Sequence, residues 1–183
     1  MIKNGLNKLF WGFLFISINF RICGIDIFPD VIGYILFALA FNQLKENSDH
    51  FSKASTFNIF MIILSIFSIY EVQATNGGIN LGPLGILSIP IGIASFILTL
   101  FVIYNLFMGV KELMSIHNNY TLAMEADERW KQYVALLIAT AIAFIIIFIP
   151  VLNIIYALVL FGFSIVFLVK TLKFVNDCKN FFN

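Results

Sequence analysis

Residues 133–169 read YVALLIATAIAFIIIFIPVLNIIYALVLFGFSIVFLV, a stretch without a charged side chain. At 1.5 Å per residue a straight helix of this length would measure about 55 Å, whereas the hydrocarbon core of a bilayer is about 30 Å thick. The stretch must therefore fold back on itself, and Pro150 and Asn153 mark the turn. It predicts two antiparallel membrane helices.

The composition of the whole chain also indicates that lipid surrounds it. Of the 183 residues, 61% are apolar and 11% are charged, whereas soluble domains carry about 25% charged residues. A soluble core of this size could not bury so many apolar side chains, so lipid must cover much of the surface. The formal net charge of +1 argues against nucleic acid as a partner. We expect a single integral membrane domain over residues 1–183.

Apolar stretches predict an all-α fold, a polytopic membrane bundle of six transmembrane helices arranged as three hairpins. A span needs about 20 residues, so the first stretch is marginal and the second is short. Pro29, Pro90 and Pro150 each open the second helix of a hairpin, where proline is favoured because its missing N–H is not needed. They indicate either ordinary helix starts or a threefold hairpin repeat. The six predicted spans are Leu6–Cys23, Asp30–Leu44, Phe57–Gln73, Ile89–Val110, Tyr133–Ile149 and Val151–Val169.

Basic residues predict the orientation, because cytoplasmic loops carry an excess of Lys and Arg. With both termini in the cytoplasm, ten of the eleven basic residues lie inside and only Arg21 lies outside. A first hairpin that enters the membrane and returns would leave the same pattern. The polar inner loops are Lys45–Ser55 and Lys111–Lys131, and Thr121–Gln132 predicts a helical extension of the fifth span. The ten inner residues are Lys3, Lys8, Lys45, Lys53, Lys111, Arg129, Lys131, Lys170, Lys173 and Lys179.

The first hairpin is too short to cross the membrane comfortably. Residues Leu9–Leu44 must cross and return, which leaves roughly 15 residues, or about 23 Å, for each helix. The turn Gly24–Pro29 is therefore expected below the outer surface. An arginine at such depth costs about 2.5–3.5 kcal/mol on insertion scales, so Arg21 should face an acidic partner or a wet cavity.

The acidic partners available on the outer side form the candidate site. One interpretation is a structural ion pair that lets the short hairpin pack. A second is an outward-facing pocket for a small polar ligand, with a cation favoured because the charged members sum to −2. A third is a set of loosely placed interfacial charges. The cluster comprises Asn19, Arg21, Asp26, Asp30, Tyr34, Tyr70 and Glu71.

Other polar and small residues have plainer interpretations. Ala135, Ala139 and Ala143 form a small-residue stripe at intervals of four, which lets helices approach closely within the chain or between subunits. His50 and His117 lie in inner loops and are expected in solvent. Asn42, Asn105 and Asn153 are lone amides in or near the spans and are expected to hydrogen-bond between helices. Cys23 and Cys178 fall on opposite sides of the membrane and cannot pair. No metal or cofactor motif and no catalytic residue is identified.

The segment Ile25–Leu39, IDIFPDVIGYILFAL, resembles a pattern of uncharacterised multi-pass membrane proteins from low-GC Gram-positive bacteria. The matching positions are Asp26, Pro29, Asp30, Gly33 and Tyr34. The resemblance implies a multi-pass protein of the bacterial cytoplasmic (inner) membrane and no known activity. By architecture alone, six helices in this length are similar to the substrate-binding subunits of energy-coupling-factor vitamin transporters, which bind ligands through outer loops.

Two functions from different classes follow. The first is a non-enzymatic membrane protein that acts by association, as an accessory, regulatory or immunity-type subunit with another membrane subunit or as a homo-oligomer. The alternative is a solute-binding or transport subunit with its pocket at Arg21, Asp26, Asp30 and Glu71. A membrane-embedded enzyme is a more distant third.

Overall fold

Six α-helices follow one another along the part of the chain that the structure describes. A computed structural model of the protein describes residues 1–18, 21–22, 25–26, 30–66, 85–146 and 149–182. Over these residues the predicted number of helices is confirmed. The helices are α1 (Ile2–Ser17), α2 (Asp30–Leu44), α3 (Asp49–Ile66), α4 (Ser88–Ile116), α5 (Tyr120–Ile146) and α6 (Pro150–Phe181).

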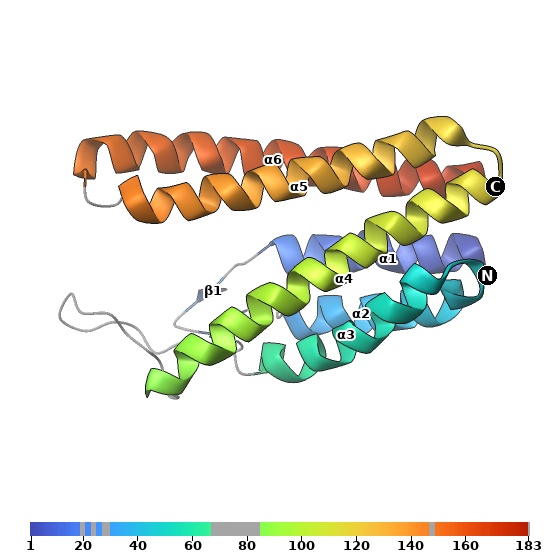
Figure 1. Cartoon of the computed structure of the whole chain (residues 1–183), viewed down its shortest axis with the longest axis horizontal. Coiled ribbons are helices and arrows are strands. Elements are labelled where there is room, and N and C mark those ends of the chain that lie inside the picture. Colours follow the sequence, from blue (N-terminus) through green and yellow to red (C-terminus); the bar gives the residue numbers. More distant parts are fainter. Residues whose placement is uncertain (19–20, 23–24, 27–29, 67–84, 147–148, 183) are drawn as a thin grey trace.

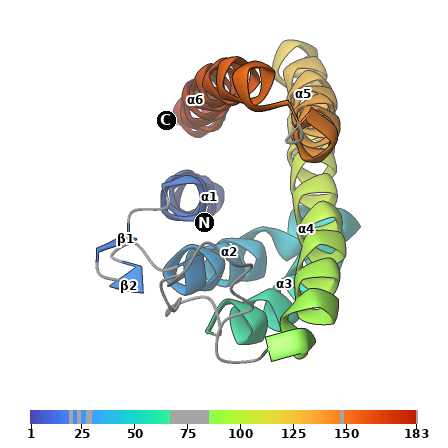
Figure 2. The ribbon, with the colours of Figure 1, turned by 90° about the vertical axis from the view of Figure 1, so that its left-hand side faces the viewer.

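The helices are arranged as a ring in sequence order. Each packs against the helix before it, and α6 closes the ring by packing against α1 (Figure 2). Successive helices run in opposite directions, so the N- and C-termini lie at the same end (Figure 1). We refer to this end as the terminal end and to the opposite end, where α2, α4 and α6 begin, as the distal end.

Basic side chains gather toward the terminal end. Each of the ten predicted inner Lys and Arg residues lies in a helix half nearest to the terminal end or in the short 3₁₀ helix η1 (Lys45–Asn47) there. The exception is Arg21, in the two-residue strand β1 (Arg21–Ile22) at the distal end. The helix directions thus give the charge asymmetry that the sequence predicts.

Phenylalanine rings join the helices in the core. Phe13 of α1 lies 5.3 Å from Phe37 of α2 and 5.8 Å from Phe107 of α4, measured between ring centroids. Phe107 in turn lies 6.4 Å from Phe174 of α6. All four side chains are at most 5% exposed, and rings at these separations add attraction beyond the burial of their area. These rings thus link α1, α2, α4 and α6 through the core.

Two glycines let α1 and α2 approach closely. A Cβ at Gly12 would lie 2.4 Å from the Phe37 ring, and one at Gly33 would lie 2.5 Å from the Ile16 side chain and 2.9 Å from the Gly12 carbonyl oxygen. The two glycine backbones are thus in direct contact, as in small-residue helix pairs within membranes. Gly33 belongs to the IDIFPDVIGY segment, so one feature of that segment has a packing explanation.

The first hairpin is short, as its sequence predicts. Helices α1 and α2 have 16 and 15 residues, or about 24 and 22 Å. Helices α4 and α6 have 29 and 32 residues, about 44 and 48 Å. Among the described residues, only 90–116 and α6 are long and apolar enough to cross a membrane by length and composition.

The inner loops are shorter than predicted because side-chain caps extend the helices. Ser48 Oγ accepts a hydrogen bond from the His50 backbone N–H at 3.1 Å, so α3 begins at Asp49 rather than near residue 57. Asn119 Oδ1 accepts from the Leu122 N–H at 3.1 Å, and α5 includes the predicted extension Thr121–Gln132. His50 is therefore helical and half-buried, 2.9 Å from Asn105 Oδ1, and the expectation that it lies in solvent is wrong.

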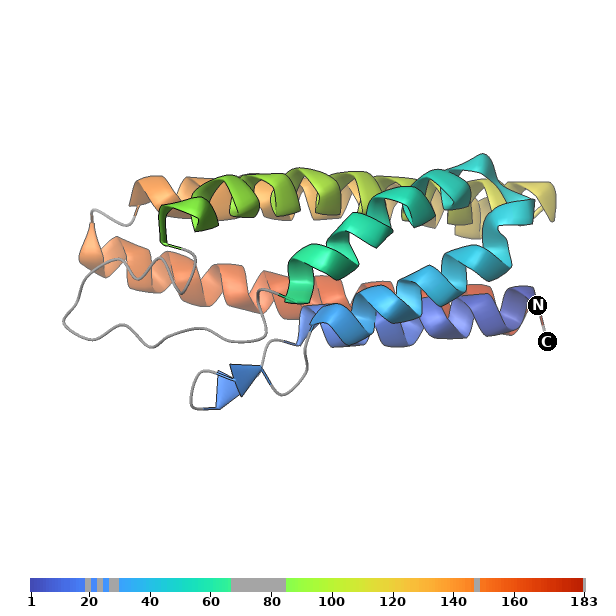
Figure 3. The same ribbon diagram turned by 90° about the horizontal axis from the view of Figure 1, so that it is seen from below.

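A two-stranded β-ribbon adds to the predicted all-helical fold. β1 pairs antiparallel with β2 (Ile25–Asp26), and the register places Arg21 opposite Asp26 and Ile22 opposite Ile25. The pair lies to one side of the helices at the distal ends of α1 and α2 (Figure 3). Another 3₁₀ helix, η2 (Gly85–Leu87), precedes α4. The ribbon brings the backbones of two predicted cluster members together.

Candidate functional site

The distal ends of α2, α3 and α4 enclose a polar pocket that includes two predicted site residues. Asp30 is the first residue of α2, where a carboxylate is favoured by the helix dipole. Tyr34 follows one turn later on the same face. The cavity measures about 220 Å³. Its lining comprises Asp30 and Tyr34 from α2, Met61, Leu64 and Ser65 from α3, and Ser95, Phe96 and Thr99 from α4.

A chain of hydrogen bonds fixes Tyr34 across the pocket. The Tyr34 and Thr99 hydroxyl oxygens are 3.4 Å apart, and Thr99 Oγ1 donates to Met61 Sδ at 3.7 Å. Because Thr99 has a single hydroxyl proton, it must accept from Tyr34, so Tyr34 is the donor. Asn58 Nδ2 donates to the Tyr34 carbonyl at 2.7 Å. Three helices therefore hold one phenol that is 4% exposed.

These assignments make the pocket rich in acceptors. The Tyr34 proton is directed to Thr99, and the Ser65 hydroxyl proton is directed to the Ile62 carbonyl at 3.0 Å. Each oxygen therefore acts as an acceptor toward any further group. An ionised Asp30 carboxylate only accepts hydrogen bonds. The oxygens of Tyr34, Ser65 and Asp30 in the lining can thus accept hydrogen bonds, which suits a group that carries N–H donors.

The pocket is recessed along α4. Asp30 shares the cavity with Ser95 and Thr99, although α4 begins at Ser88. Seven residues separate Ser88 from Ser95, which corresponds to about 10 Å along the helix. The start of α2 therefore lies about two turns below the distal end of α4. The predicted recessed turn, Gly24–Pro29, is described only at Ile25 and Asp26.

The side chains of the other predicted site residues are not described. Arg21 and Asp26 oppose each other in the ribbon, for which only the backbone is described. Asn19, Tyr70 and Glu71 lie outside the described residues. The structure thus brings Asp30 and Tyr34 together.

Sequence reasoning missed the hydroxyl residues of α3 and α4. Ser95 and Thr99 are four residues apart and therefore share one helix face. A pair of hydroxyls at this spacing in an apolar helix is a signal that could have placed this face of α4 toward Tyr34. Ser65 carries no comparable signal, because a lone serine near a helix end also occurs in ordinary packing.

A second polar network lies at the terminal end, where its side chains hydrogen-bond to one another and join helices. Ser48 donates to Glu112 Oε2 and joins α3 to α4. Asp127 of α5 accepts from Lys131 at 2.7 Å and from Lys111 of α4 at 3.1 Å. These two hydrogen bonds hold the pKa of Asp127 below its usual value. The network ties the α4–α5 turn together, and the described residues there form no metal-binding group.

Comparisons of the chain with protein-family models, with curated proteins and with solved structures find no match. The function of the chain must therefore be argued from its own sequence and structure.

Proposed function

We propose that the chain is an integral protein of the bacterial cytoplasmic membrane whose six helices cross it with both termini inside. The grouping of basic residues at the terminal end supports this orientation, because cytoplasmic segments are enriched in Lys and Arg. The bare surface of α6 supports lipid as the solvent, since none of its most apolar stretch is buried. The short α1–α2 hairpin fits a membrane that is locally thinned or an outer face that is recessed.

We further propose that the protein binds a small cationic solute at Asp30, without catalysis. The observation that carries this is the recessed cavity in which Asp30 lies with Tyr34, Ser95 and Thr99. Polar groups at membrane depth are costly and mark functional sites by default. A cavity of about 220 Å³ lies below the usual range for drug-sized ligands, which favours a solute of amine size.

Thermal unfolding of the purified protein tests this proposal. Methylammonium and ethylammonium should raise the melting temperature, and sodium acetate at the same ionic strength should not. Asp30→Asn should abolish the increase. Asp49→Asn is the matched control, because Asp49 is also the first residue of a helix but lies exposed at the terminal end. If neither cation shifts the melting temperature, or if the shift survives in Asp30→Asn, the proposal is wrong.

Association with another membrane subunit is the second candidate, and the exposure of α6 favours it. Val151, Leu158 and Phe161 are 73%, 68% and 66% exposed and lie on one side of the helix. Such a helix suits an accessory or regulatory subunit as well as lipid. Leu158→Gln should then release a membrane protein that co-purifies stoichiometrically in mild detergent, whereas Ile63→Gln on α3 should not. Recovery of the lone chain from the wild type would count against association.

A further inference from the structure

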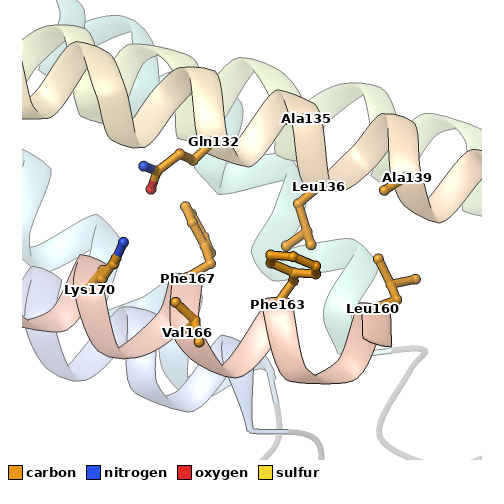
Figure 4. A pocket seen from close by; sticks show the side chains of 9 residues that line it. All are labelled: Gln132, Ala135, Leu136, Ala139, Leu160, Phe163, Val166, Phe167 and Lys170. Atoms are coloured by element: carbon orange, nitrogen blue, oxygen red, sulfur yellow. The ribbon is translucent and has the colours of Figure 1, made fainter. Parts of the chain in front are cut away.

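An elongated groove runs between α5 and α6. Its volume is about 370 Å³. Two members of the small-residue stripe, Ala135 and Ala139, form one wall, and Tyr156 Oη of α6 closes the helix pair by donating to the Ala139 carbonyl at 2.7 Å. The lining comprises Gln132, Ala135, Leu136 and Ala139 from α5 and Leu160, Phe163, Val166, Phe167 and Lys170 from α6 (Figure 4).

The groove is polar at one end and apolar along the rest of its length. Figure 4 shows the Lys170 amine and the Gln132 amide pointing toward each other from opposite helices. The remaining lining side chains are aliphatic or aromatic. Among the described residues Lys170 has no acidic partner within ion-pair distance. A charged head and an apolar tail therefore match the two parts of the groove.

Arg129 orients the Gln132 amide. The guanidinium of Arg129 donates from Nη1 to Gln132 Oε1 at 2.6 Å and from Nη2 to Glu125 at 3.3 Å, and the residue is 7% exposed. Since Arg can only donate, the amide oxygen must face Arg129. The Gln132 NH₂ group is then available as a donor beside the Lys170 ammonium, and both groups suit an anion.

The position of the groove along the helices fits a lipid of one leaflet. Thr171 and Phe174, within about a turn of Lys170, are completely buried. The groove thus continues the core-facing side of α6 at the level where the packed core ends. Its polar end is directed toward the terminal end, where the basic residues gather. In the orientation proposed above, the polar end lies nearer the cytoplasmic face and the apolar part extends into the membrane.

We propose that this groove binds an anionic phospholipid of the cytoplasmic leaflet. Lys170 and Gln132 contact the phosphate, and one acyl chain lies along Ala135, Ala139 and Phe163. Basic pockets between helices on this side of membranes bind anionic head groups. Charge complementarity favours lipid over a second copy of the chain, because a symmetric contact would bring two Lys170 side chains together. This site rests on the proposed membrane orientation but not on solute binding at Asp30.

Native mass spectrometry and thermal unfolding in nanodiscs test the lipid site. Phosphatidylglycerol should be retained and should raise the melting temperature more than phosphatidylcholine does. Lys170→Gln should weaken phosphatidylglycerol retention about fivefold, which corresponds to roughly 1 kcal/mol for one basic residue. Lys173→Gln is the matched control, because Lys173 is exposed on the same helix but does not line the groove. Equal retention of the two lipids, or no effect of Lys170→Gln, overturns the proposal.

A steric variant tests the same proposal if Lys170→Gln folds poorly. Ala135 is exposed and lines the groove, so Ala135→Leu should fill the groove and reduce retention, while Ala141→Leu on an exposed face of α5 should not. Inorganic phosphate alone should not reproduce the stabilisation. If it does, or if Ala135→Leu abolishes a dimer and leaves phosphatidylglycerol bound, the lipid proposal fails. The methylammonium shift, measured on the same preparations, reports separately on solute binding.

Discussion

The hydroxyl groups of Tyr34 and Thr99, which are 65 positions apart in the sequence, lie 3.4 Å from each other and join α2 to α4 across the distal pocket. Thr99 Oγ1 donates a hydrogen bond to Met61 Sδ of α3. One phenol is thus the point at which three helices meet below the pocket.

Tyr34→Phe removes the hydroxyl group that donates a hydrogen bond to Thr99 Oγ1. The expected loss is about 0.5–1.5 kcal/mol of unfolding free energy, the usual net contribution of one hydrogen bond. Thr99→Val removes the same contact from the other side, so the two substitutions should be strongly non-additive in a double-mutant cycle of chemical unfolding. Additive losses would show that the hydroxyls do not interact.

The contact between Gly12 and Gly33 predicts that a larger residue at position 33 lowers the stability of the fold. Gly33→Ala places a methyl group 2.5 Å from the Ile16 side chain and 2.9 Å from a backbone oxygen, so α1 and α2 must separate. Overpacking of this kind costs about 1–3 kcal/mol. Gly162→Ala is the matched control, because its Cβ would meet nothing within 4 Å and alanine favours the helix. The thermal unfolding midpoint should fall for the first variant and hold or rise for the second; similar falls for both would contradict the close contact.

The helix pattern was predictable where sequence alone carries the signal. The bounds of α2, Asp30–Leu44, match the predicted span, and α6 begins at Pro150, where proline is favoured. The early start of α3 at Asp49 was not predicted, because its first two turns are polar and the hydropathy signal begins only near Phe57. Its N-terminus depends on the Ser48 cap and the contact of Ser48 with Glu112.

The candidate site was predictable only in part, for the same kind of reason. Asp30 and Tyr34 stand out because charged and polar groups are rare in apolar helices. Ser65 and Thr99, which line the same pocket, come from α3 and α4, and which faces of those helices meet is a property of packing rather than of local pattern. The Arg129–Gln132 hydrogen bond was missed because both residues belong to a stretch that reads as an ordinary polar helix start.

Asp127 makes the stability of the α4–α5 turn depend on pH. Hydrogen bonds from Lys131 and Lys111 lower its pKa in the folded protein. A lowered folded-state pKa stabilises the fold above the pKa of the unfolded chain, and this stabilisation is lost as the pH falls through the folded value. The unfolded carboxyl titrates near pH 4, so the loss begins below about pH 4. Because the ion pairs are solvent-accessible, the effect is expected to be small and reduced by salt.

Asp127→Asn should therefore be less stable than the wild type near neutral pH, and the difference should disappear in strong acid. Melting temperatures measured for both proteins across the acidic range check this. Glu128→Gln removes an exposed neighbouring carboxylate and should show little of this dependence. If the melting temperature of the wild type instead rose further above that of Asp127→Asn as the pH falls below 4, the result would contradict the proposed ion pairs.

The orientation of the chain can be tested with two exposed positions at opposite ends. Tyr120, at the start of α5, is 63% exposed at the terminal end, and Ile149, just before α6, is 55% exposed at the distal end. Cys178 is completely buried, so it should react slowly in the folded protein. In a Cys23→Ser background, a membrane-impermeant maleimide added to intact cells should label Ile149→Cys and not Tyr120→Cys. Permeabilised cells should label both, which controls for accessibility. Labelling of Tyr120→Cys in intact cells would reverse the orientation, and with it the assignment of the α5–α6 groove to the cytoplasmic leaflet.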